Sequence, residues 1–363
     1  MDRIYIIDSV NTALSVSLHV AQCGTNCSLV YEKKTGIDDQ YDLRIVCEKI
    51  YENLTLLPSK IIEVPSLYFL AHGENLLKRI SMRRWVKRKI CKDNVYDMNA
   101  TYIGPRTSSI MQSLTSARRI FIDHGCGEYG TRAKYIINPR YRFVAYFKHW
   151  LMYVLGMPNH DASIGSEIIS LCKMENDWAF HIDYQLVRVT KHLEDLFKGL
   201  RGLIQGDDLI LCLLEGERHT KDGLPVYSGL YDAANLNLIM NHASPNNFVI
   251  LKFHPALYLS GNKPNTQIDK LLIERGIKSI VLDDHLPEDL KSMIPSEIIV
   301  KYFLIKKIIC ECSATVCNTS HVENISSICD FKAFPDFYMR NQLSYQSLSY
   351  INNLILNKIQ ILK

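Results

Sequence analysis

Short apolar runs alternate along the chain with longer stretches in which apolar residues recur at helical spacing. The runs have the length and residue types of buried strands, and the longer stretches are typical of amphipathic helices. Strands are predicted at residues 4–7, 28–31, 61–64, 101–104, 120–122, 209–214, 248–253, 279–282 and 308–312. Helices are predicted at residues 10–21, 43–54, 75–91, 108–116, 227–241 and 267–275, from 287, from 294, and at 344–363. This alternation predicts an α/β protein built on parallel sheets.

The alternation runs in two series that are separated near residues 195–207. A chain of 363 residues is also longer than one hydrophobic core usually holds. We therefore expect two Rossmann-like domains, an N-terminal one at 1–200 and a C-terminal one at 201–340. The remaining segment, 341–363, is expected to be a terminal helix that packs back on the N-terminal domain.

The composition argues against several classes of partner and site but does not identify a function. The chain is 47% hydrophobic and 22% charged, as is usual for soluble globular proteins, and its net charge of +4 is too small to indicate a nucleic-acid partner. Its 11 cysteines include no Cys-x-x-Cys pair and no set with zinc-ligand spacing, so no metal site is predicted. We find no signal peptide and no apolar stretch of about 18 residues, so a cytoplasmic location is expected.

Candidate chemistry begins at the end of the strand predicted at 120–122. Asp123 and His124 follow this strand at its carboxyl end, where the ligands of open α/β sheets bind, and either side chain can accept a proton. Gly125 and Gly127 allow the backbone to approach a ligand closely. The alternative interpretation is a tight turn with a solvated Asp-His pair.

A second group of candidates lies at the end of the strand predicted at 248–253, in the motif Lys252-x-His254-Pro255. His254 is titratable, and Pro255 restricts it to an extended conformation. A single histidine is more often structural than catalytic. Candidate residues follow a strand in each half of the chain, however. Two such positions are harder to explain as structural, and they favour a functional role.

Polar residues follow other strands of the second half as well. Hydroxyl and amide groups at such strand ends can hold a phosphate group. The turn Asp283-Asp284-His285 is interpreted as solvated rather than as a metal site. The candidates at the ends of the strands predicted at 209–214 and 308–312 are Glu215, Gly216, Ser313 and Thr315.

A basic helix is predicted between Leu76 and Lys92, a stretch that contains eight Lys and Arg residues and Trp85. Runs of charge are usually solvated helix faces. The density of charge here favours contact with an anionic membrane surface or with an anionic glycan acceptor. The candidate contact residues are Arg83, Arg84, Lys87, Arg88 and Lys89.

Three of these motifs resemble those of bacterial sialyltransferases of the glycosyltransferase B (GT-B) type, which include polysialyltransferases and lipooligosaccharide sialyltransferases. These families carry acidic-acidic-Gly, His-Pro and Ser-Ser/Thr motifs. The similar segments here, in the same order, are Asp123-His124-Gly125, His254-Pro255 and Ser313-Ala314-Thr315. His124 and Ala314 depart from the family pattern, and the first departure leaves open whether Asp123 or His124 is the base.

Two further segments extend the resemblance. Gly125, Glu128 and Tyr129 follow Asp123 at the spacing of Asp-Asp-Gly-x-x-Glu-Tyr, a motif of one sialyltransferase family. Ile294-Pro295-Ser296-Glu297 is similar to the Ile-Pro-x-Glu that precedes a nucleotide-contacting helix in these enzymes.

The resemblance implies the GT-B architecture, with the active site in the cleft between two domains. It implies an inverting transfer of sialic acid from CMP-sialic acid to a hydroxyl group of a bacterial surface glycan, such as a capsule or lipooligosaccharide, without metal or cofactor. Asp123 or His124 would deprotonate the acceptor, and protonated His254 would neutralise the departing phosphate. Donor-binding roles are implied for Glu297, at the ribose, and for Lys252, Pro255, Glu215, Gly216, Ser313 and Thr315.

The residues leave other functions open. The same fold serves CMP-Kdo and UDP-sugar donors, nucleotide-sugar epimerases use similar acid-base residues, and a polysaccharide assembly protein would need no catalysis. The expected partners are a CMP-sugar and an anionic or neutral glycan acceptor, with peripheral contact at the inner membrane surface and no nucleic acid. The motifs define neither the acceptor nor the linkage, and they do not separate single transfer from polymerisation.

Overall fold

The protein is described by a computed structural model. It describes residues 3–7, 10–23, 27–32, 43–55, 60–64, 81, 84–85, 88–89, 97–101, 118–122, 143–144, 147, 151, 167–175, 179–204, 206, 208–214, 229–254, 266–291, 293–334 and 342–362. Contacts divide these residues into two units, with the division between Arg188 and Val189. Within the described part, no helix has both the length and the apolar character needed to cross a membrane.

The first unit is built on a seven-stranded sheet in which each neighbouring pair of strands is parallel. Its strands are β1 Arg3–Ile7, β2 Cys27–Glu32, β3 Lys60–Val64, β4 Asp97–Thr101, β5 Arg118–Ile122, β6 Glu167–Ser170 and β7 Ala179–His181. They lie in the order β3-β2-β1-β4-β5-β6-β7. Its helices are α1 Val10–Cys23, α2 Leu43–Ile50, α3 Glu52–Thr55 and the short 3₁₀ helix η2 Tyr184–Leu186.

The second unit is built on a six-stranded sheet, again with parallel neighbours throughout. Its strands are β8 Leu209–Leu214, β9 Phe248–Phe253, β10 Lys278–Val281, β11 Lys307–Cys310, β12 Ser326–Asp330 and β13 Ile359–Leu362. They lie in the order β10-β9-β8-β11-β12-β13. Its helices are α8 Lys191–Arg201, α9 Gly229–His242, α11 Ile268–Glu274, α12 Ser296–Phe303, α13 Ala314–Asn318 and α14 Gln342–Leu354, with 3₁₀ helices η3 Leu282–His285 and η4 Phe331–Ala333.

Both sheets therefore have the strand order of Rossmann domains, in which the third, second, first, fourth, fifth and sixth strands lie side by side. The direction of winding reverses between β1 and β4 in the first sheet and between β8 and β11 in the second. The predicted fold class, α/β with two Rossmann-like domains, is confirmed. Parallel connections are right-handed, so helices formed before and after the reversal cover opposite faces of a sheet.

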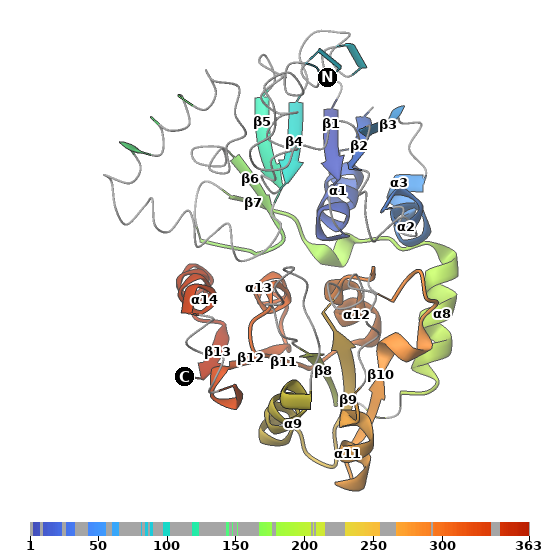
Figure 1. The fold of residues 1–363 in the computed structure, drawn as a ribbon, viewed down its shortest axis with the longest axis vertical. Helices are drawn as coiled ribbons and strands as arrows, with labels where there is room; N and C mark the ends of the chain where they lie inside the picture. The colour runs from blue at the N-terminus through green and yellow to red at the C-terminus, as the bar shows by residue number, and fades with distance from the viewer. Residues whose placement is uncertain are drawn as a thin grey trace. The chain divides into compact units, whose positions relative to one another are not determined.

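In the second unit, this reversal puts α9 and α11 on one face of the sheet and α13 and α14 on the other (Figure 1). The core beneath α9 and α11 takes alternate residues from each strand. It contains Ile210, Cys212 and Leu214 of β8, Val249, Leu251 and Phe253 of β9, Tyr231 and Leu238 of α9, and Ile268 and Leu272 of α11. Successive strand residues point to opposite faces, so Lys252 lies on the face away from this core.

The predicted domain boundary at residues 200 and 201 falls at the end of α8, and the structure moves it to Arg188 and Val189. Leu193, Phe197 and Leu200 of α8 are buried at helical spacing. The Phe197 ring lies 5.4 Å from that of Phe303 in α12. The helix therefore packs within the second unit and does not end the first.

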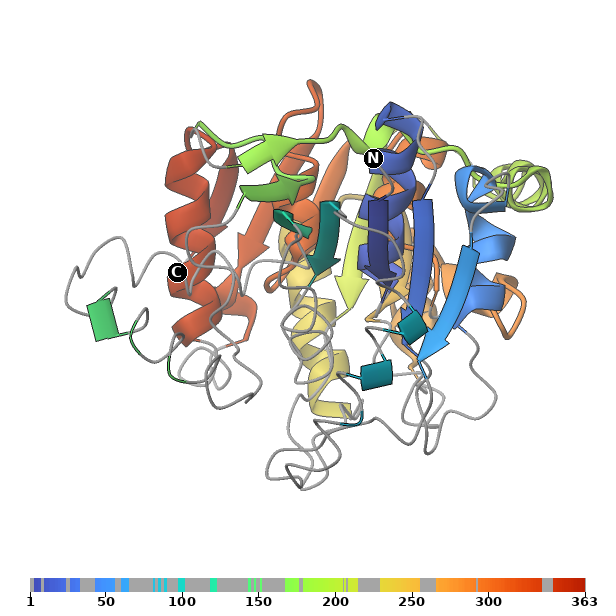
Figure 2. The same cartoon turned by 90° about the horizontal axis from the view of Figure 1, so that it is seen from above.

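The prediction for the end of the chain is wrong in two respects. The segment predicted as one helix forms α14 and then the strand β13, which pairs with β12. It belongs to the second unit instead of packing on the first. Asn352 ties α14 to the start of β13, because its side chain bonds both the amide and the carbonyl of Ile359 at 2.9 Å. Figures 1 and 2 both show α14 beside β12 and β13.

Smaller differences concern element ends. The strand predicted at 101–104 lies earlier, as β4, and the helix predicted at 43–54 is divided into α2 and α3. The segment after 287 forms turns rather than a helix. Strands β6, β7 and β12 and helices α8 and α13 were not predicted. Most other predicted elements of the described part appear within a few residues of their expected bounds.

Candidate functional site

The carboxyl edge of the second sheet carries most of the described candidates. Strands β9, β8 and β11 are consecutive in this sheet, and the reversal of winding lies between β8 and β11. Neighbouring strands lie about 4.8 Å apart, so the carboxyl ends of β9 and β11 are separated by roughly 10 Å. His254 follows β9 directly, and Ser313 follows β11 after two residues. Ligands of open α/β sheets bind at this type of position.

His254 is exposed, and its backbone is held to the neighbouring strand. Its amide donates to the carbonyl oxygen of Leu214, at the end of β8, over 3.3 Å. The preceding amide, of Phe253, donates to Asp283 Oδ2 over 2.9 Å. The backbone around His254 is thus bonded on both sides while its side chain faces solvent.

Lys252 differs from the expectation of a donor-contacting residue. Its side chain is only 1% exposed, and Nζ lies 3.3 Å from Asp283 Oδ1, whose side chain is fully buried. The same Nζ donates to the carbonyl oxygen of Lys291 at 3.5 Å. The prediction of a solvated turn is therefore wrong for Asp283, whereas Asp284 and His285 are exposed as expected.

Glu297 occupies the first turn of α12, as the Ile-Pro-x-Glu segment predicts. Its carboxylate is buried and accepts a hydrogen bond from Asn318 Nδ2 at 2.8 Å. Burial raises the pKa of the Glu297 carboxyl, and hydrogen bonds from Asn318 and Thr315 act in the opposite direction. The positive charge of Lys252 also lowers the pKa of Glu297. A carboxylate with several donors around it can take a further donor, such as a hydroxyl group.

Ser313 and Thr315 begin the short helix α13. Ser313 is its N-cap, and its Oγ accepts from the Thr315 amide at 3.3 Å. Thr315 is buried and turned toward Glu297, with which its side chain forms a hydrogen bond. The Glu297 carboxyl therefore interacts with Thr315 by hydrogen bonding and with Lys252 by charge, and three separate sequence motifs supply these residues.

Several predicted residues cannot be located, because they lie outside the described residues. They are Asp123, His124, Gly125, Gly127, Glu128, Glu215, Gly216, Pro255, Arg83 and Lys87. Arg84, Arg88 and Lys89 are described, and all three are helical and exposed. Their assignment to an acceptor or a membrane surface stays a prediction.

Sequence reasoning missed Asp283 and Asn318 as members of this site. Asp283 directly follows a predicted strand, as His254 does, and that position was a usable signal. Asn318 carries no comparable signal, because it becomes a partner of Glu297 only when α13 packs beside α12. Among the described residues, no group of three His, Cys, Asp or Glu side chains is arranged to hold a metal ion.

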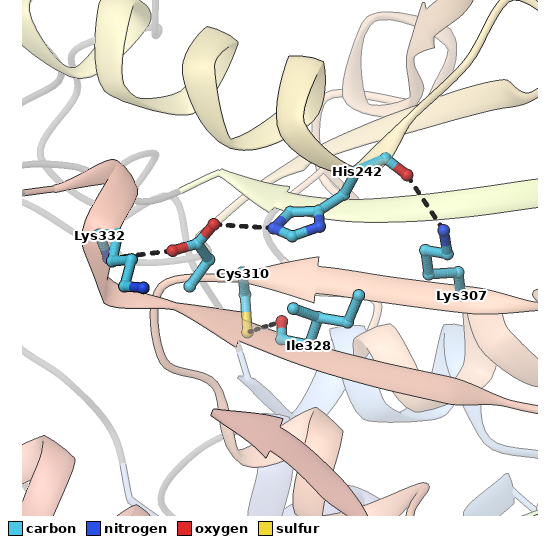
Figure 3. Close-up of polar contacts among 6 residues, drawn as sticks. His242, Lys307, Cys310, Ile328 and Lys332 are labelled. Atoms are coloured by element: carbon cyan, nitrogen blue, oxygen red, sulfur yellow. Dashed lines mark hydrogen bonds and ion pairs between the residues drawn. The ribbon is translucent and has the colours of Figure 1, made fainter. Parts of the chain in front are cut away.

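A second polar cluster joins α9 to β11 and β12. His242 Nε2 and Asp330 Oδ2 are 2.8 Å apart, and Asp330 Oδ1 accepts from the Lys332 amide at 3.0 Å. Lys307 Nζ donates to the His242 carbonyl oxygen at 3.0 Å. Figure 3 shows the ring and the carbonyl group of His242 pointing in opposite directions, the carbonyl toward Lys307. None of these residues was predicted to belong to the site.

No protein-family model matches the chain, and no curated protein sequence matches it. Solved structures of similar fold include the UDP-GlcNAc 2-epimerase from Neisseria meningitidis bound to UDP-GlcNAc, with a TM-score of 0.48, 10% identity and coverage of 99% of this chain and 96% of that one. A UDP-glucosyltransferase from Polygonum tinctorium has a TM-score of 0.46, 8% identity and coverage of 98% and 93%. The ADP-heptose lps heptosyltransferase II of E. coli has a TM-score of 0.40, 10% identity and coverage of 99% of both chains. At TM-scores below 0.5, these similarities define neither the activity nor the substrate of this chain.

Proposed function

We propose that the protein is an inverting glycosyltransferase that transfers sialic acid from CMP-sialic acid to a hydroxyl group of a bacterial surface glycan. One observation carries the proposal: three separate motifs belong to one edge of one Rossmann-like sheet, beside its reversal of winding. They supply His254, Glu297, and the pair Ser313 and Thr315. The choice of CMP-sialic acid rests on the sequence resemblance.

The donor nucleotide is assigned to this edge on chemical grounds. The buried Glu297 carboxylate would accept hydrogen bonds from the ribose hydroxyl groups, with Asn318 holding it in place. The Ser313 hydroxyl accepts from the Thr315 amide and keeps its own proton, which it can donate to a phosphate oxygen.

The leaving group defines the role of His254. In the transfer, the bond between the anomeric carbon of sialic acid and the phosphate oxygen of CMP breaks, and negative charge develops on that oxygen. Protonated His254, which is exposed beside the nucleotide edge, donates to this oxygen. A positioned donor of this kind contributes on the order of 10²-fold or more to the rate.

The acceptor side completes the reaction. The acceptor oxygen forms a bond to the anomeric carbon from the opposite face, which inverts the configuration, and its proton passes to a base. The sequence offers Asp123 and His124 for this role. This scheme accounts for the proton, the sugar and the leaving group without a metal ion. That the reaction needs no metal stays a prediction.

The first test is a calorimetric titration with CMP in the presence of EDTA, with UDP and GDP as controls. We expect selective binding of CMP. Preference for UDP would contradict the proposed donor and leave a transferase or epimerase that uses a UDP-sugar. A folded protein that binds none of the three would favour a non-catalytic assembly protein.

The second test separates chemistry from binding. We expect His254→Ala to lower the rate of transfer from CMP-sialic acid at least about 10²-fold while CMP binding changes little. His285→Ala is the matched control, because His285 is also exposed and lies at the end of η3 in the same unit. Equal activity of the two variants would remove His254 from the mechanism.

A further inference from the structure

We propose that Lys252 and Asp283 are positioning residues, which hold the end of β9 so that His254 faces the donor, and that Lys252 does not contact the donor itself. The inference rests on the proposed function for the role of His254. It reverses the role that the sequence resemblance implies for Lys252, and it adds Asp283 to the residues on which transfer depends.

The first argument is how the ladder between β9 and β10 ends. The last backbone-paired residues of these strands are Leu251 and Val281. Two residues further along each strand, the Phe253 amide donates to the side chain of Asp283 over 2.9 Å. The carboxylate takes the place of the carbonyl group that a longer β10 would have supplied. The ladder therefore continues up to the residue that precedes His254.

The opposite side of β9 is held as well. The His254 amide donates to the Leu214 carbonyl oxygen of β8 at 3.3 Å. Consecutive amides at the end of the strand are thus bonded to different neighbours, one through backbone and one through a side chain. Loss of the Asp283 contact would leave this strand end attached on one side alone.

The second argument concerns the orientation of Asp283. Its Oδ1 faces Lys252 Nζ at 3.3 Å, while its Oδ2 faces the Phe253 amide. Lys252 also donates to the Lys291 carbonyl oxygen, and its side chain is 1% exposed. Two acceptors of the protein therefore already engage this ammonium group, an arrangement that suits a group that fixes another side chain.

The charge of Lys252 also acts on a second carboxyl group. It opposes the effect of burial on the pKa of Glu297, in the first turn of α12. The pair is therefore linked to the residue proposed for the ribose as well as to the strand end of His254. Displacement of a catalytic group by about 1 Å can lower a rate on the order of 10²-fold.

Two double variants isolate the contact with Phe253. Lys252→Met with Asp283→Leu removes both charges and the acceptor for the Phe253 amide. Lys252→Met with Asp283→Asn removes both charges but keeps an amide oxygen that can accept from it. Replacing a buried ion pair by neutral groups of similar volume usually preserves folding, which circular dichroism checks. Asp283→Ala is a further variant without the acceptor, and Asp284→Asn is the exposed control.

Three quantities are measured for each variant: hydrogen exchange of the Phe253 amide, the Kd of CMP, and the kcat of transfer. For the variant with Asp283→Leu, we expect exchange to accelerate at least about 10-fold and kcat to fall on the order of 10²-fold, with the Kd of CMP within about 3-fold. For the variant with Asp283→Asn, we expect exchange and kcat within about 5-fold of the parent protein, as a rescue by the retained acceptor.

Each other outcome contradicts the proposal. A loss of CMP affinity of more than about 10-fold in both folded double variants would show that Lys252 contacts the donor. If hydrogen exchange of the Phe253 amide and kcat are both unchanged in the variant with Asp283→Leu, Lys252 and Asp283 contribute only to packing. If the parent protein neither binds CMP nor transfers sialic acid, the proposed function fails. In that case, the exchange of the Phe253 amide, which needs no ligand, still decides whether Asp283 holds the strand end.

Discussion

Two ion pairs of the second unit differ in what surrounds them. Lys252 and Asp283 are 1% and 0% exposed, and His242 and Asp330 are 12% and 3% exposed. Both pairs join segments that are distant in sequence. A fully buried ammonium group that loses its carboxylate partner is left without compensation, whereas the His242 side chain is partly exposed to water. Loss of the acid therefore has different consequences in the two pairs.

The pairs also differ in their neighbours. Asp283 bonds the amide that precedes His254, and the charge of Lys252 lowers the pKa of Glu297. Asp330 bonds the Lys332 amide and ties α9 to β12, and it contacts none of the proposed site residues that the structure describes. The first pair should therefore matter for both stability and rate, and the second for stability alone. The following predictions test this difference, beginning with the largest effect.

Asp283→Ala should reduce the free energy of unfolding by about 3–5 kcal/mol, because it leaves the Lys252 ammonium group buried without its carboxylate. Urea denaturation of this variant and of the control Asp284→Ala measures the effect. The exposed Asp284 should change stability by less than about 0.5 kcal/mol. A loss for Asp283→Ala no larger than that of its neighbour would mean that the pair adds little to stability.

Asp330→Ala should reduce the free energy of unfolding by about 1–3 kcal/mol, since it removes the hydrogen bonds to the His242 ring and to the Lys332 amide. Asp330→Asn should lose less, because its amide oxygen can still accept from the Lys332 amide. The kcat of transfer and the Kd of CMP should match those of the parent protein at a temperature where the variant is folded. A fall in kcat would contradict the prediction that the pair of His242 and Asp330 affects stability alone.

Glu297→Gln should weaken CMP binding by roughly 10-fold or more, because it replaces a charged acceptor for the ribose by a neutral one. Burial raises the pKa of Glu297 above its ordinary value of 4.5, so this carboxyl favours the folded state most below that value. Its contribution is lost as the pH rises from 4.5 through the raised pKa. The variant should therefore lose less stability over that range than the parent protein, as urea midpoints at several pH values would show. If the pH dependence of stability were the same in the variant and the parent protein, it would contradict the raised pKa of Glu297.

Lys307→Met should have the smallest effect, a loss of about 1 kcal/mol. Its amine donates to the carbonyl oxygen of His242, the last residue of α9, where a cation also interacts favourably with the helix end. The exposed neighbour Lys306 provides the control, as Lys306→Met. Equal urea midpoints for the two variants would show that the contact adds nothing measurable.

Local sequence patterns predicted most strands of both sheets, because a buried strand in a parallel sheet is a short apolar run. They failed where the pattern was ambiguous or weak. The run that became β13 was absorbed into a helix, since its short apolar stretch continues the helical spacing of α14. The amphipathic helix α8 was overlooked because the domain boundary was expected within it. Some of these errors concern where elements end and what they pack on, and others are whole elements that were missed, namely β6, β7, β12, α8 and α13.

The candidate site likewise contains features that the local sequence predicted and contacts that only the fold created. The sequence by itself determined that His254 and Ser313 follow strands and that Glu297 opens a helix, since strand ends and helix starts depend on adjacent residues. Only the tertiary structure decided that Lys252 faces Asp283 rather than solvent, and that Asn318 holds Glu297. Those contacts join residues that are 31 and 21 positions apart. They form only when the strand order of the sheet brings β9 beside β10, and when α13 packs against α12.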